Sequence, residues 1–268
     1  MRTFYLCVRT SLLYIAAMDA NERLAALVDL LQRDGRVEVA DVAEAFGAAE
    51  MTIRRDLDRM VAMGMARRVR GGAISQLMRG EELPFAMRAI ERTEAKARIG
   101  AAVAGVLRDG EAVLLDSGST AIKVAQALGN RRLTVMPMSL HIAQVLSAND
   151  SVRMLMPGGE IRSGELAMVG PLTLASISAL RFDTVVLGCC GLSDGRVTAY
   201  DLGDASVKQA MLGSSARVIL AADGSKFRQT AMAVVCDASA LDVVVTDTDA
   251  PTDDVDGLRA AGIEVLCV

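Results

Sequence analysis

The sequence predicts an α/β protein with two parts: a small helical N-terminal domain that ends in a basic hairpin, and a larger, mostly parallel α/β domain. Short amphipathic helices followed by an arginine-rich stretch predict the first part, in residues 20–75. From residue 93 onward, short continuous apolar runs alternate with helical stretches, which is typical of a parallel sheet covered on both faces. The 268 residues, 52% of them apolar, are enough to bury a core in each part.

Residues 1–19 combine Arg2 and Arg9 with an apolar run, Leu12–Ala17, as a short signal peptide would. The run is too short to span a bilayer, and Arg9 interrupts the apolar stretch. We therefore expect an N-terminal extension in front of a true translation start at Met18, and a cytoplasmic protein that does not insert into a membrane.

Three helices are expected in residues 20–75. Apolar side chains recur at helical spacing in Glu22–Arg33, and a similar pattern marks Val39–Phe46. A short turn, Gly47–Glu50, leads into a third helix, Glu50–Met63. Helix, short glycine-containing turn and helix form the outline of a helix-turn-helix.

The third helix has two unlike faces. Ile53, Leu57, Met60 and Val61 form an apolar stripe, and the opposite face is cationic and almost free of bulk. Such a face suits a helix that enters the major groove of DNA, because arginine can bond to guanine edges and to phosphates. The helix residues expected to bind DNA are Met51, Thr52, Arg54, Arg55 and Arg59.

The basic stretch after this helix is expected to form a β-wing on the phosphate backbone. Charge is segregated along the chain: residues 51–79 hold seven Arg and two Asp, whereas residues 19–50 hold three Arg and eight acidic residues. The chain as a whole carries a net charge of −4, so the basic face is local. A local basic face predicts double-stranded DNA as a partner. The wing residues expected to bind DNA are Arg67, Arg68, Arg70, Gly71 and Gly72.

Residues 76–92 show no sustained period and include Pro84, so we expect a linker there. Residues 93–268 then form the α/β domain, which we expect to bind an effector and to oligomerise. Its expected strands are the apolar runs Ala112–Leu115, Leu133–Met136, Val152–Met156, Thr184–Leu187, Val218–Ala221, Ala231–Cys236, Val243–Thr246 and Ile263–Cys267.

Ligands of parallel sheets bind at the carboxyl ends of the strands. Small and hydroxyl-bearing residues follow the first strand and open a helix, Ala121–Leu128, where backbone N–H groups can hold an anion. Paired glycines follow the third strand, and two of the four lysines lie near later strand ends. The residues expected to bind the effector are Asp116, Ser117, Gly118, Ser119, Thr120, Gly158, Gly159, Asp201, Asp204, Lys208 and Lys226.

Metal-binding residue types are scarce. The five cysteines show no CxxC spacing, and His141 is the only histidine. No zinc or haem site can be assembled from these residues, so we expect neither a metal nor a cofactor. Reduced, mostly buried cysteines are the expectation for a cytoplasmic protein.

The helical motifs together resemble the DeoR family of bacterial transcriptional repressors. TIRRDL at Thr52–Leu57, the preceding VADVAEAFG and the trailing RGGA at Arg70–Ala73 resemble the winged helix-turn-helix of that family. Two positions depart from the family pattern: Ala49 stands where a serine usually precedes the recognition helix, and Arg70 replaces a histidine. Losing a capping hydroxyl should cost about 1 kcal/mol of helix stability.

The later motifs are similar to the effector domain of the same family. DSGST, PGGE, DASVKQAM and AADGSKF occur in the family's order. The resemblance implies a fold similar to ribose-5-phosphate isomerase and the coenzyme A transferases, and an effector that is a phosphorylated sugar or polyol. Met138 departs from the pattern, because the family usually has an asparagine at this place after the second strand.

Three hypotheses follow. The first is a repressor of a carbohydrate or polyol utilisation operon, controlled by a sugar phosphate, with no enzymatic activity. It would be a homo-oligomer, a dimer or tetramer, because one recognition helix reads too few base pairs to select an operator. The second is a sugar-phosphate isomerase that uses Asp201, Asp204 and Lys208 as acid and base, although an isomerase has no use for a basic DNA-binding module. The third, a purely structural oligomerisation domain, leaves the DSGST loop unexplained.

Overall fold

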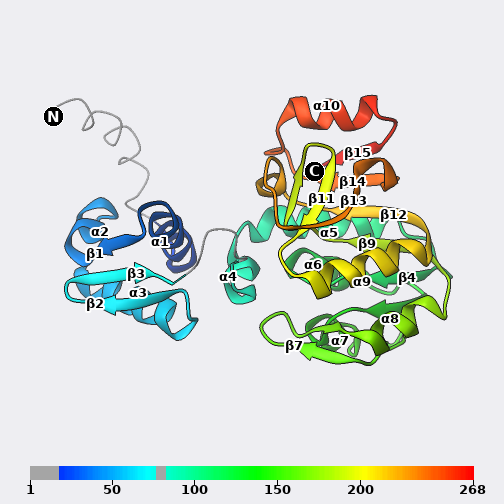
Figure 1. Ribbon diagram of the computed structural model, residues 1–268, viewed down its shortest axis with the longest axis horizontal. Helices are drawn as coiled ribbons and strands as arrows, with labels where there is room; N and C mark the ends of the chain where they lie inside the picture. The colour runs from blue at the N-terminus through cyan, green and yellow to red at the C-terminus, as the bar shows by residue number, and fades with distance from the viewer. Residues whose placement is uncertain (1–17, 77–82) are drawn as a thin grey trace. The chain divides into compact units, whose positions relative to one another are not determined.

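The computed structural model describes residues 18–76 and 83–268. The chain divides into two compact units, Met1–Glu91 and Arg92–Val268 (Figure 1). The N-terminal extension was expected in residues 1–19, of which residues 1–17 lie outside the described residues. None of the helices in the two described ranges is long and apolar enough to cross a membrane.

The N-terminal unit contains the expected helix-turn-helix. Its first helix opens with a capping box, in which the Asp19 and Glu22 carboxylates each accept a bond from the other's backbone N–H. Leu24 and Ile53 are fully buried in a core to which all three helices contribute. The helices are α1 (Ala20–Asp34), α2 (Val39–Ala45) and α3 (Glu50–Ala62).

A three-stranded antiparallel sheet of order β1-β3-β2 completes this fold. β2 (Ala66–Val69) and β3 (Gly72–Ser75) form the expected wing. β1 (Arg36–Glu38) was not predicted, because three residues are too few to show an alternation. The pairing of β1 with β3 requires glycine at position 72, since a Cβ atom there would lie 1.9 Å from the Val37 carbonyl oxygen.

Helix α4 (Phe85–Ile90) lies in the segment that we expected to be a linker. Met87 is fully buried and belongs to the apolar core of the N-terminal unit, and Leu83 and Ile90 pack against the same cluster. A six-residue helix shows little more than one apolar repeat, so its pattern is too short to recognise in the sequence. The C-terminal unit begins two residues after this helix, at Arg92.

The C-terminal unit is built on a seven-stranded parallel sheet of order β15-β14-β12-β9-β4-β5-β6 (Figure 1). Seven of the eight expected strands lie in it. Their bounds are β4 (Ala112–Leu115), β5 (Leu133–Pro137), β6 (Val152–Met154), β9 (Phe182–Leu187), β12 (Ser215–Ala221), β14 (Val243–Thr246) and β15 (Glu264–Cys267).

The prediction that Ala231–Cys236 lies in the parallel sheet was wrong. This run forms β13 (Ala233–Asp237), which pairs antiparallel with β11 (Arg196–Ala199) in a separate sheet that also contains β10 (Gly191–Ser193). An apolar run indicates a buried strand but does not identify its partner. β10 and β11, and a second short hairpin of β7 (Glu160–Arg162) with β8 (Ala167–Val169), were not predicted.

Helices cover both faces of the parallel sheet, as the continuous apolar strands predicted. Side chains alternate between two cores: Val113 and Leu115 pack with α5, α6 and α7, whereas Leu114 packs with α8, α9 and α10. The helices are α5 (Thr93–Val106), α6 (Ser119–Ala127), α7 (Leu140–Leu146), α8 (Pro171–Ser178), α9 (Leu202–Gly213) and α10 (Thr252–Ala260), with short 3-10 turns η2 (Gly224–Lys226) and η3 (Ala238–Ala240).

The strand order has a switch point between β4 and β9. From β4 the chain continues through β5 and β6 toward one edge, and from β9 through β12, β14 and β15 toward the other. The helix after β4 packs on one face of the sheet and α9, between β9 and β12, on the other. Open α/β sheets bind ligands at such a point, outside the carboxyl ends of the strands.

Candidate functional site

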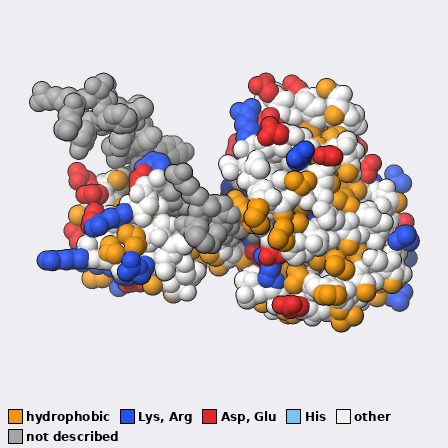
Figure 2. Space-filling model, viewed as in Figure 1, with side chains coloured by type: hydrophobic (Ala, Val, Ile, Leu, Met, Phe, Trp, Pro, Cys, Tyr) orange, Lys and Arg blue, Asp and Glu red, His pale blue; other side chains and the backbone are white. Residues whose placement is uncertain are grey.

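The outer face of α3 presents the helix residues that were expected to bind DNA. Ile53, Leu57 and Met60 are buried on the inner face. Arginine side chains project from the surface of this unit (Figure 2). On the outer face, Met51, Arg54, Arg55 and Arg59 are exposed and Thr52 is half-buried.

Two of the expected DNA-binding arginines already hold acidic partners. Arg54 donates to Glu50 one turn earlier on α3, at 2.7 Å. Arg68 of the wing pairs with Asp58 of α3 at 3.2 Å, which links the wing to the recognition helix. Within the described residues, no ion pair is formed by the other cations of this face, which are Arg55, Arg59, Arg67 and Arg70.

A buried ion pair that the sequence did not reveal positions the recognition helix. Asp56 of α3 accepts a bond of 2.6 Å from Nε of Arg23 on α1, and both side chains are largely buried. The helix itself starts without a side-chain cap, since Ala49 at the N-cap forms no side-chain hydrogen bond. The contact with α1 therefore supplies support that the missing cap does not.

At the switch point, Asp116 is the centre of a buried polar cluster. It follows β4 and is 1% exposed. Its carboxylate accepts bonds of 2.8 Å from the backbone N–H groups of Ser117 and Gly188, the latter just after β9. Asp116 therefore joins the loops that follow the two strands of the switch point.

The ammonium group of Lys208, on α9, completes this cluster. It donates to Asp116 Oδ2 and lies 3.5 Å from Asp204 Oδ2. Burial alone would lower the pKa of Lys208, but the two carboxylates raise the pKa above its ordinary value. The Lys208 ammonium is therefore paired with carboxylates inside the protein. Lys208, which the sequence predicts as an effector-binding residue, is thus buried against Asp116 and Asp204.

The loop that follows Asp116 opens helix α6. Gly118 is the N-cap, with a positive φ of 102° and no side chain to cap the helix, and Ser119 and Thr120 form the first turn. Ser117 and Ser119 are buried beside the cluster, while Thr120 is half-buried. The first N–H groups of a helix have no intrahelical acceptors, so this end of α6 can accept an anion.

Lys226 lies on the other side of β9 from this loop, in the turn η2 that follows β12. Its half-buried side chain forms no ion pair among the described residues. Burial raises the pKa of the Cys189 thiol, just after β9, to about 12, although Lys226 and Lys208 both act in the opposite direction. The Cys189 thiol is thus near enough to both lysines to be affected by their charge, and the sequence analysis did not single it out.

The remaining residues that were expected to bind the effector, Asp201, Gly158 and Gly159, form contacts within the protein. Asp201 caps α9 by accepting a bond of 2.8 Å from the Asp204 N–H. Gly159 packs so closely on α8 that a Cβ atom would lie 2.0 Å from the Thr173 hydroxyl oxygen. That hydroxyl donates to the Gly158 carbonyl at 2.8 Å. The paired glycines therefore hold the loop against α8.

Met138, which replaces an asparagine of the family pattern, is 1% exposed and belongs to the apolar core. Its backbone bonds the Leu115 carbonyl, directly before Asp116, and the Met168 N–H. The position is thus next to the switch point, but its side chain offers no polar contact.

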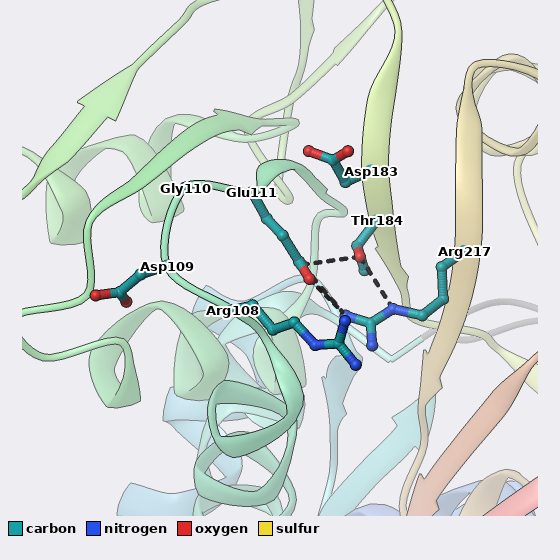
Figure 3. A pocket seen from close by; sticks show the side chains of 7 residues that line it. All are labelled: Arg108, Asp109, Gly110, Glu111, Asp183, Thr184 and Arg217. Atoms are coloured by element: carbon teal, nitrogen blue, oxygen red, sulfur yellow. Dashed lines mark hydrogen bonds and ion pairs between the residues drawn. The ribbon is translucent and has the colours of Figure 1, made fainter.

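A depression at the opposite, amino-terminal edge of the sheet does not fit a ligand site. It is lined by polar residues around β4, β9 and β12 (Figure 3). Glu111 in it bonds Arg217 at 3.2 Å and Thr184 at 3.0 Å, and Asp183 accepts the Ala112 N–H at 2.8 Å. These bonds pair Glu111 and Asp183 with groups of the protein itself. In the described part of the chain, no group of three or more His, Cys, Asp or Glu residues is arranged to hold a metal ion.

A winged helix-turn-helix with an exposed basic face, joined to an α/β unit with polar groups at its switch point, defines a DNA-binding transcriptional regulator with a sensor domain. Two family models match this chain. Residues 23–77 match the DeoR-like helix-turn-helix domain, and residues 91–248 match the DeoR C terminal sensor domain. The chain belongs to the DeoR family of transcriptional repressors.

Named relatives agree with this assignment. The chain is 32% identical to the glycerol-3-phosphate regulon repressor of Escherichia coli (strain K12), with 87% of this chain and 93% of the relative covered. It is 33% identical to the transcriptional repressor AccR of Agrobacterium fabrum, with 87% and 91% covered. It is 26% identical to the lactose phosphotransferase system repressor of Lactococcus lactis, with 86% and 92% covered.

Solved structures resemble the chain only distantly. The ribose 5-phosphate isomerase A of Methanocaldococcus jannaschii is 12% identical with a TM-score of 0.38, and 51% of this chain and 55% of that chain are covered. The eIF2B delta of Chaetomium thermophilum is 13% identical with a TM-score of 0.46, with 89% and 94% covered.

Proposed function

We propose that this protein represses a carbohydrate or polyol utilisation operon from the cytoplasm, and that a phosphorylated sugar or polyol bound to the C-terminal unit changes its operator affinity. The observation that carries the effector proposal is the uncapped start of α6 at the switch point, with Lys226 in the turn after β12 at the same carboxyl edge of the sheet. Helix N–H groups favour an anion there, and a cation on the same edge of the sheet adds to that preference. The relative at 32% identity is named the glycerol-3-phosphate regulon repressor. Glycerol 3-phosphate is a phosphorylated polyol.

In this proposal the phosphate binds the N–H groups of the loop, with the hydroxyls of Ser117, Ser119 and Thr120, and Lys226 supplies the counter-charge. Lys208 is held by Asp116 and Asp204, so it shapes the site and leaves Lys226 as the available cation. A hundredfold change in operator affinity requires the effector to distinguish two conformations by about 2.7 kcal/mol. One or two charge-assisted hydrogen bonds formed in a single state are enough.

Calorimetry with matched ligands tests the effector. The panel is glycerol 3-phosphate, ribose 5-phosphate and glucose 6-phosphate, each paired with its unphosphorylated form. One phosphate should bind at least about tenfold more tightly than its partner, and Lys226→Ala should remove that difference. Lys123→Ala is the matched control, since Lys123 is also half-buried and forms no ion pair in the described residues. Equal affinity for a sugar and its phosphate, or an unaffected Lys226→Ala variant, would refute the proposed effector.

A separate proposal concerns how α3 and the wing bind DNA. Arg55 lies on the exposed side of α3 without an acidic partner in the described residues, so it is free to bond to a base edge. Arg67 lies on β2 of the wing and is equally free for a phosphate. We expect Arg55→Ala to cost about 1–3 kcal/mol and to relax the preference at one base pair, whereas Arg67→Ala should weaken all sequences alike. Fluorescence anisotropy over a salt series, with operator and random duplexes, separates the two outcomes; equal effects of both variants would contradict this docking.

The proposal includes a homo-oligomer, a dimer or tetramer, because half-sites read by two recognition helices give the required specificity. Exposed leucines near the starts of two packed helices, Leu172 of α8 (63% exposed) and Leu202 of α9 (65% exposed), provide apolar surface for it. Light scattering at micromolar concentration should show a dimer or tetramer, and Leu202→Glu should shift the mass downward. A monomeric wild type with and without DNA would contradict this part of the proposal.

Enzymatic activity is not part of the proposed function. An isomerase would need Lys208 or a carboxylate of the cluster as a base. Lys208 is already paired with two carboxylates, which raise its pKa, and this pairing does not suit a group that must accept a proton from a substrate. The named relatives are transcriptional repressors, which fits a sensor rather than a catalyst.

A further inference from the structure

Arg92 is the first residue of the C-terminal unit and is held in place by three carboxylates. Its guanidinium lies 2.8 Å from Asp247, 2.6 Å from Asp249 and 3.2 Å from Asp223. Asp223 and Asp247 are each 1% exposed and follow neighbouring strands, β12 and β14. The carboxylates raise the pKa of Arg92 despite its partial burial, which by itself would lower it. We name Arg92 and these three residues the Arg92 clamp.

The backbone at Arg92 is in an unfavourable conformation. Its φ of 51° and ψ of 36° place it in the left-handed region, which costs a residue with a side chain about 1 kcal/mol or more. Such a conformation persists only where surrounding contacts fix it. Only Glu91 and Arg92 separate α4, whose Met87 is in the core of the N-terminal unit, from α5. The clamp therefore fixes the backbone at the covalent junction of the two units.

The Arg92 clamp and Lys226, the residue proposed to bind the phosphate, share a loop. Asp223 precedes η2, which ends in Lys226, and accepts bonds from the Ser225 N–H at 3.0 Å and the Ser225 hydroxyl at 2.5 Å. Gly224 donates to Asp247 at 2.9 Å. A Cβ atom on Gly224 would lie 2.6 Å from the Asp249 carbonyl carbon. The Lys226 turn therefore cannot move without moving the two loops that hold Arg92.

Lys226 also acts on Asp223 directly. Burial would raise the pKa of Asp223, but the Ser225 hydroxyl, Lys96 and Lys226 outweigh burial and lower the pKa. The second carboxylate oxygen of Asp223, Oδ2, is buried and accepts no hydrogen bond from the described residues. A phosphate that takes the Lys226 ammonium therefore changes the charges around a carboxylate that also holds Arg92.

We propose that the Arg92 clamp is the coupling element of this repressor: phosphate binding at Lys226 alters the clamp, and the altered clamp changes the backbone at the junction that leads to the DNA-binding unit. This inference rests on the proposed function. In it the clamp is the two-state element that both the effector and the operator bias, which allosteric coupling requires. The change passes from the clamp to the DNA-binding unit along the chain itself, through Arg92 and Glu91.

The test compares Arg92→Gln with a matched control, Arg228→Gln. Arg228 follows the same turn and pairs with Asp254 at 2.8 Å, but this pair is exposed on the surface. The DNA is a duplex selected by the wild type from a random library, and the probe is the sugar or polyol phosphate of the panel above that binds the wild type most tightly. Calorimetry gives the affinity for the phosphate, and fluorescence anisotropy gives the affinity for DNA with and without it.

In the wild type and in Arg228→Gln, saturating phosphate should change the DNA affinity about tenfold or more. In Arg92→Gln this response should fall below about threefold while the phosphate affinity stays within about threefold of the wild type, so that binding survives and coupling is lost. By reciprocity, DNA should also cease to change the phosphate affinity of the variant. A full response in Arg92→Gln would overturn the inference.

Two further measurements keep the outcome decisive. If no phosphate of the panel binds the wild type, the effector proposal fails, and the clamp is judged from DNA affinity alone: Arg92→Gln without phosphate should differ from the wild type at least about fivefold. An unchanged affinity overturns the clamp. If circular dichroism shows that Arg92→Gln does not fold, Asp249→Asn replaces it. The side chain of Asp249 is 71% exposed, so this change to the clamp should be tolerated. This variant should reduce the response at least about threefold, and an unreduced response overturns the inference.

Discussion

Replacing Lys208 by methionine is the sharpest test of the buried cluster at the switch point. Lys208 and Asp116 are 4% and 1% exposed in their side chains, and Asp204 is 10% exposed. Methionine fills a similar volume but leaves two carboxylates buried without a cation. Breaking a buried ion pair by removing one partner costs about 3–5 kcal/mol, so we expect Lys208→Met to lower the free energy of unfolding by that amount at pH 7.

The loss should depend on pH, and the direction follows from proton linkage. Without Lys208, burial and mutual repulsion raise the pKa of one carboxylate in the folded state above its unfolded value of about 3.9. The folded variant then binds more protons than the unfolded chain in the window between the two values, so its stability falls as pH rises through that window. Each pH unit contributes about 1.4 kcal/mol until the folded pKa is passed. We therefore expect a smaller loss at pH 5 than at pH 8.

Urea unfolding at pH 5, 6, 7 and 8 measures this loss. The chain has no tryptophan, so circular dichroism is the suitable signal, and the two units call for a fit that allows two transitions. Lys123→Met, the same change at a half-buried site without an ion pair in the described residues, should stay within about 0.5 kcal/mol. The double variant Lys208→Met/Asp116→Asn should recover part of the loss. A loss under about 1 kcal/mol, or one that does not vary with pH, would refute the reasoning.

Three other expectations follow from local geometry. Gly72→Ala places a Cβ atom 1.9 Å from the Val37 carbonyl oxygen, so it should separate β1 from β3 and abolish specific DNA binding. Anisotropy would show the loss of binding and thermal unfolding the loss of stability. A variant that binds and unfolds like the wild type would contradict the pairing. Burial raises the pKa of the Cys189 thiol to about 12, so iodoacetamide at pH 8 should modify the exposed Cys267 well before Cys189, as peptide mass spectrometry can establish. The pKa of Asp223 is lowered in the fold, so its carboxylate stabilises the protein above the ordinary aspartate pKa of 3.8 and loses this contribution as pH falls through the folded pKa. Asp223→Asn should therefore destabilise the protein at pH 7 and less near pH 3, which thermal unfolding at both pH values would show.

The parts of the fold that the sequence predicted are those that depend on local patterns. The helix Glu50–Ala62 follows from the spacing of Ile53, Leu57 and Met60, and the parallel strands follow from continuous apolar runs. The pairing of Ala233–Asp237 with Arg196–Ala199 does not follow from either segment, because a partner strand is chosen by long-range contacts. Helix α4 was missed for a related reason: Met87 is buried by the core of the N-terminal unit, which no local pattern records.

The candidate site shows the same division more clearly. Loop residues such as Gly118 and Lys226 could be singled out from their places after apolar runs, since the carboxyl ends of parallel strands meet at one edge. Which charges neutralise one another could not be predicted. Lys208 and Asp116 are 92 residues apart in the chain, and their ion pair is the reason why our proposal assigns the phosphate to Lys226 rather than to Lys208.

The junction of the two units is also fixed by residues that lie far apart in the chain. Arg92 lies 155 residues from Asp247 and 157 from Asp249, so nothing in the sequence near Arg92 indicates its partners. The strand order brings β12 and β14 together as neighbours, and the loops after them converge on one guanidinium. A sheet that places its ligand loops at one edge thus also places there the carboxylates that hold the first residue of the sensor unit. For this reason a ligand at Lys226 needs no long pathway through the core: a single turn, Asp223 to Lys226, separates the proposed phosphate contact from the residue that begins the connection to the DNA-binding unit.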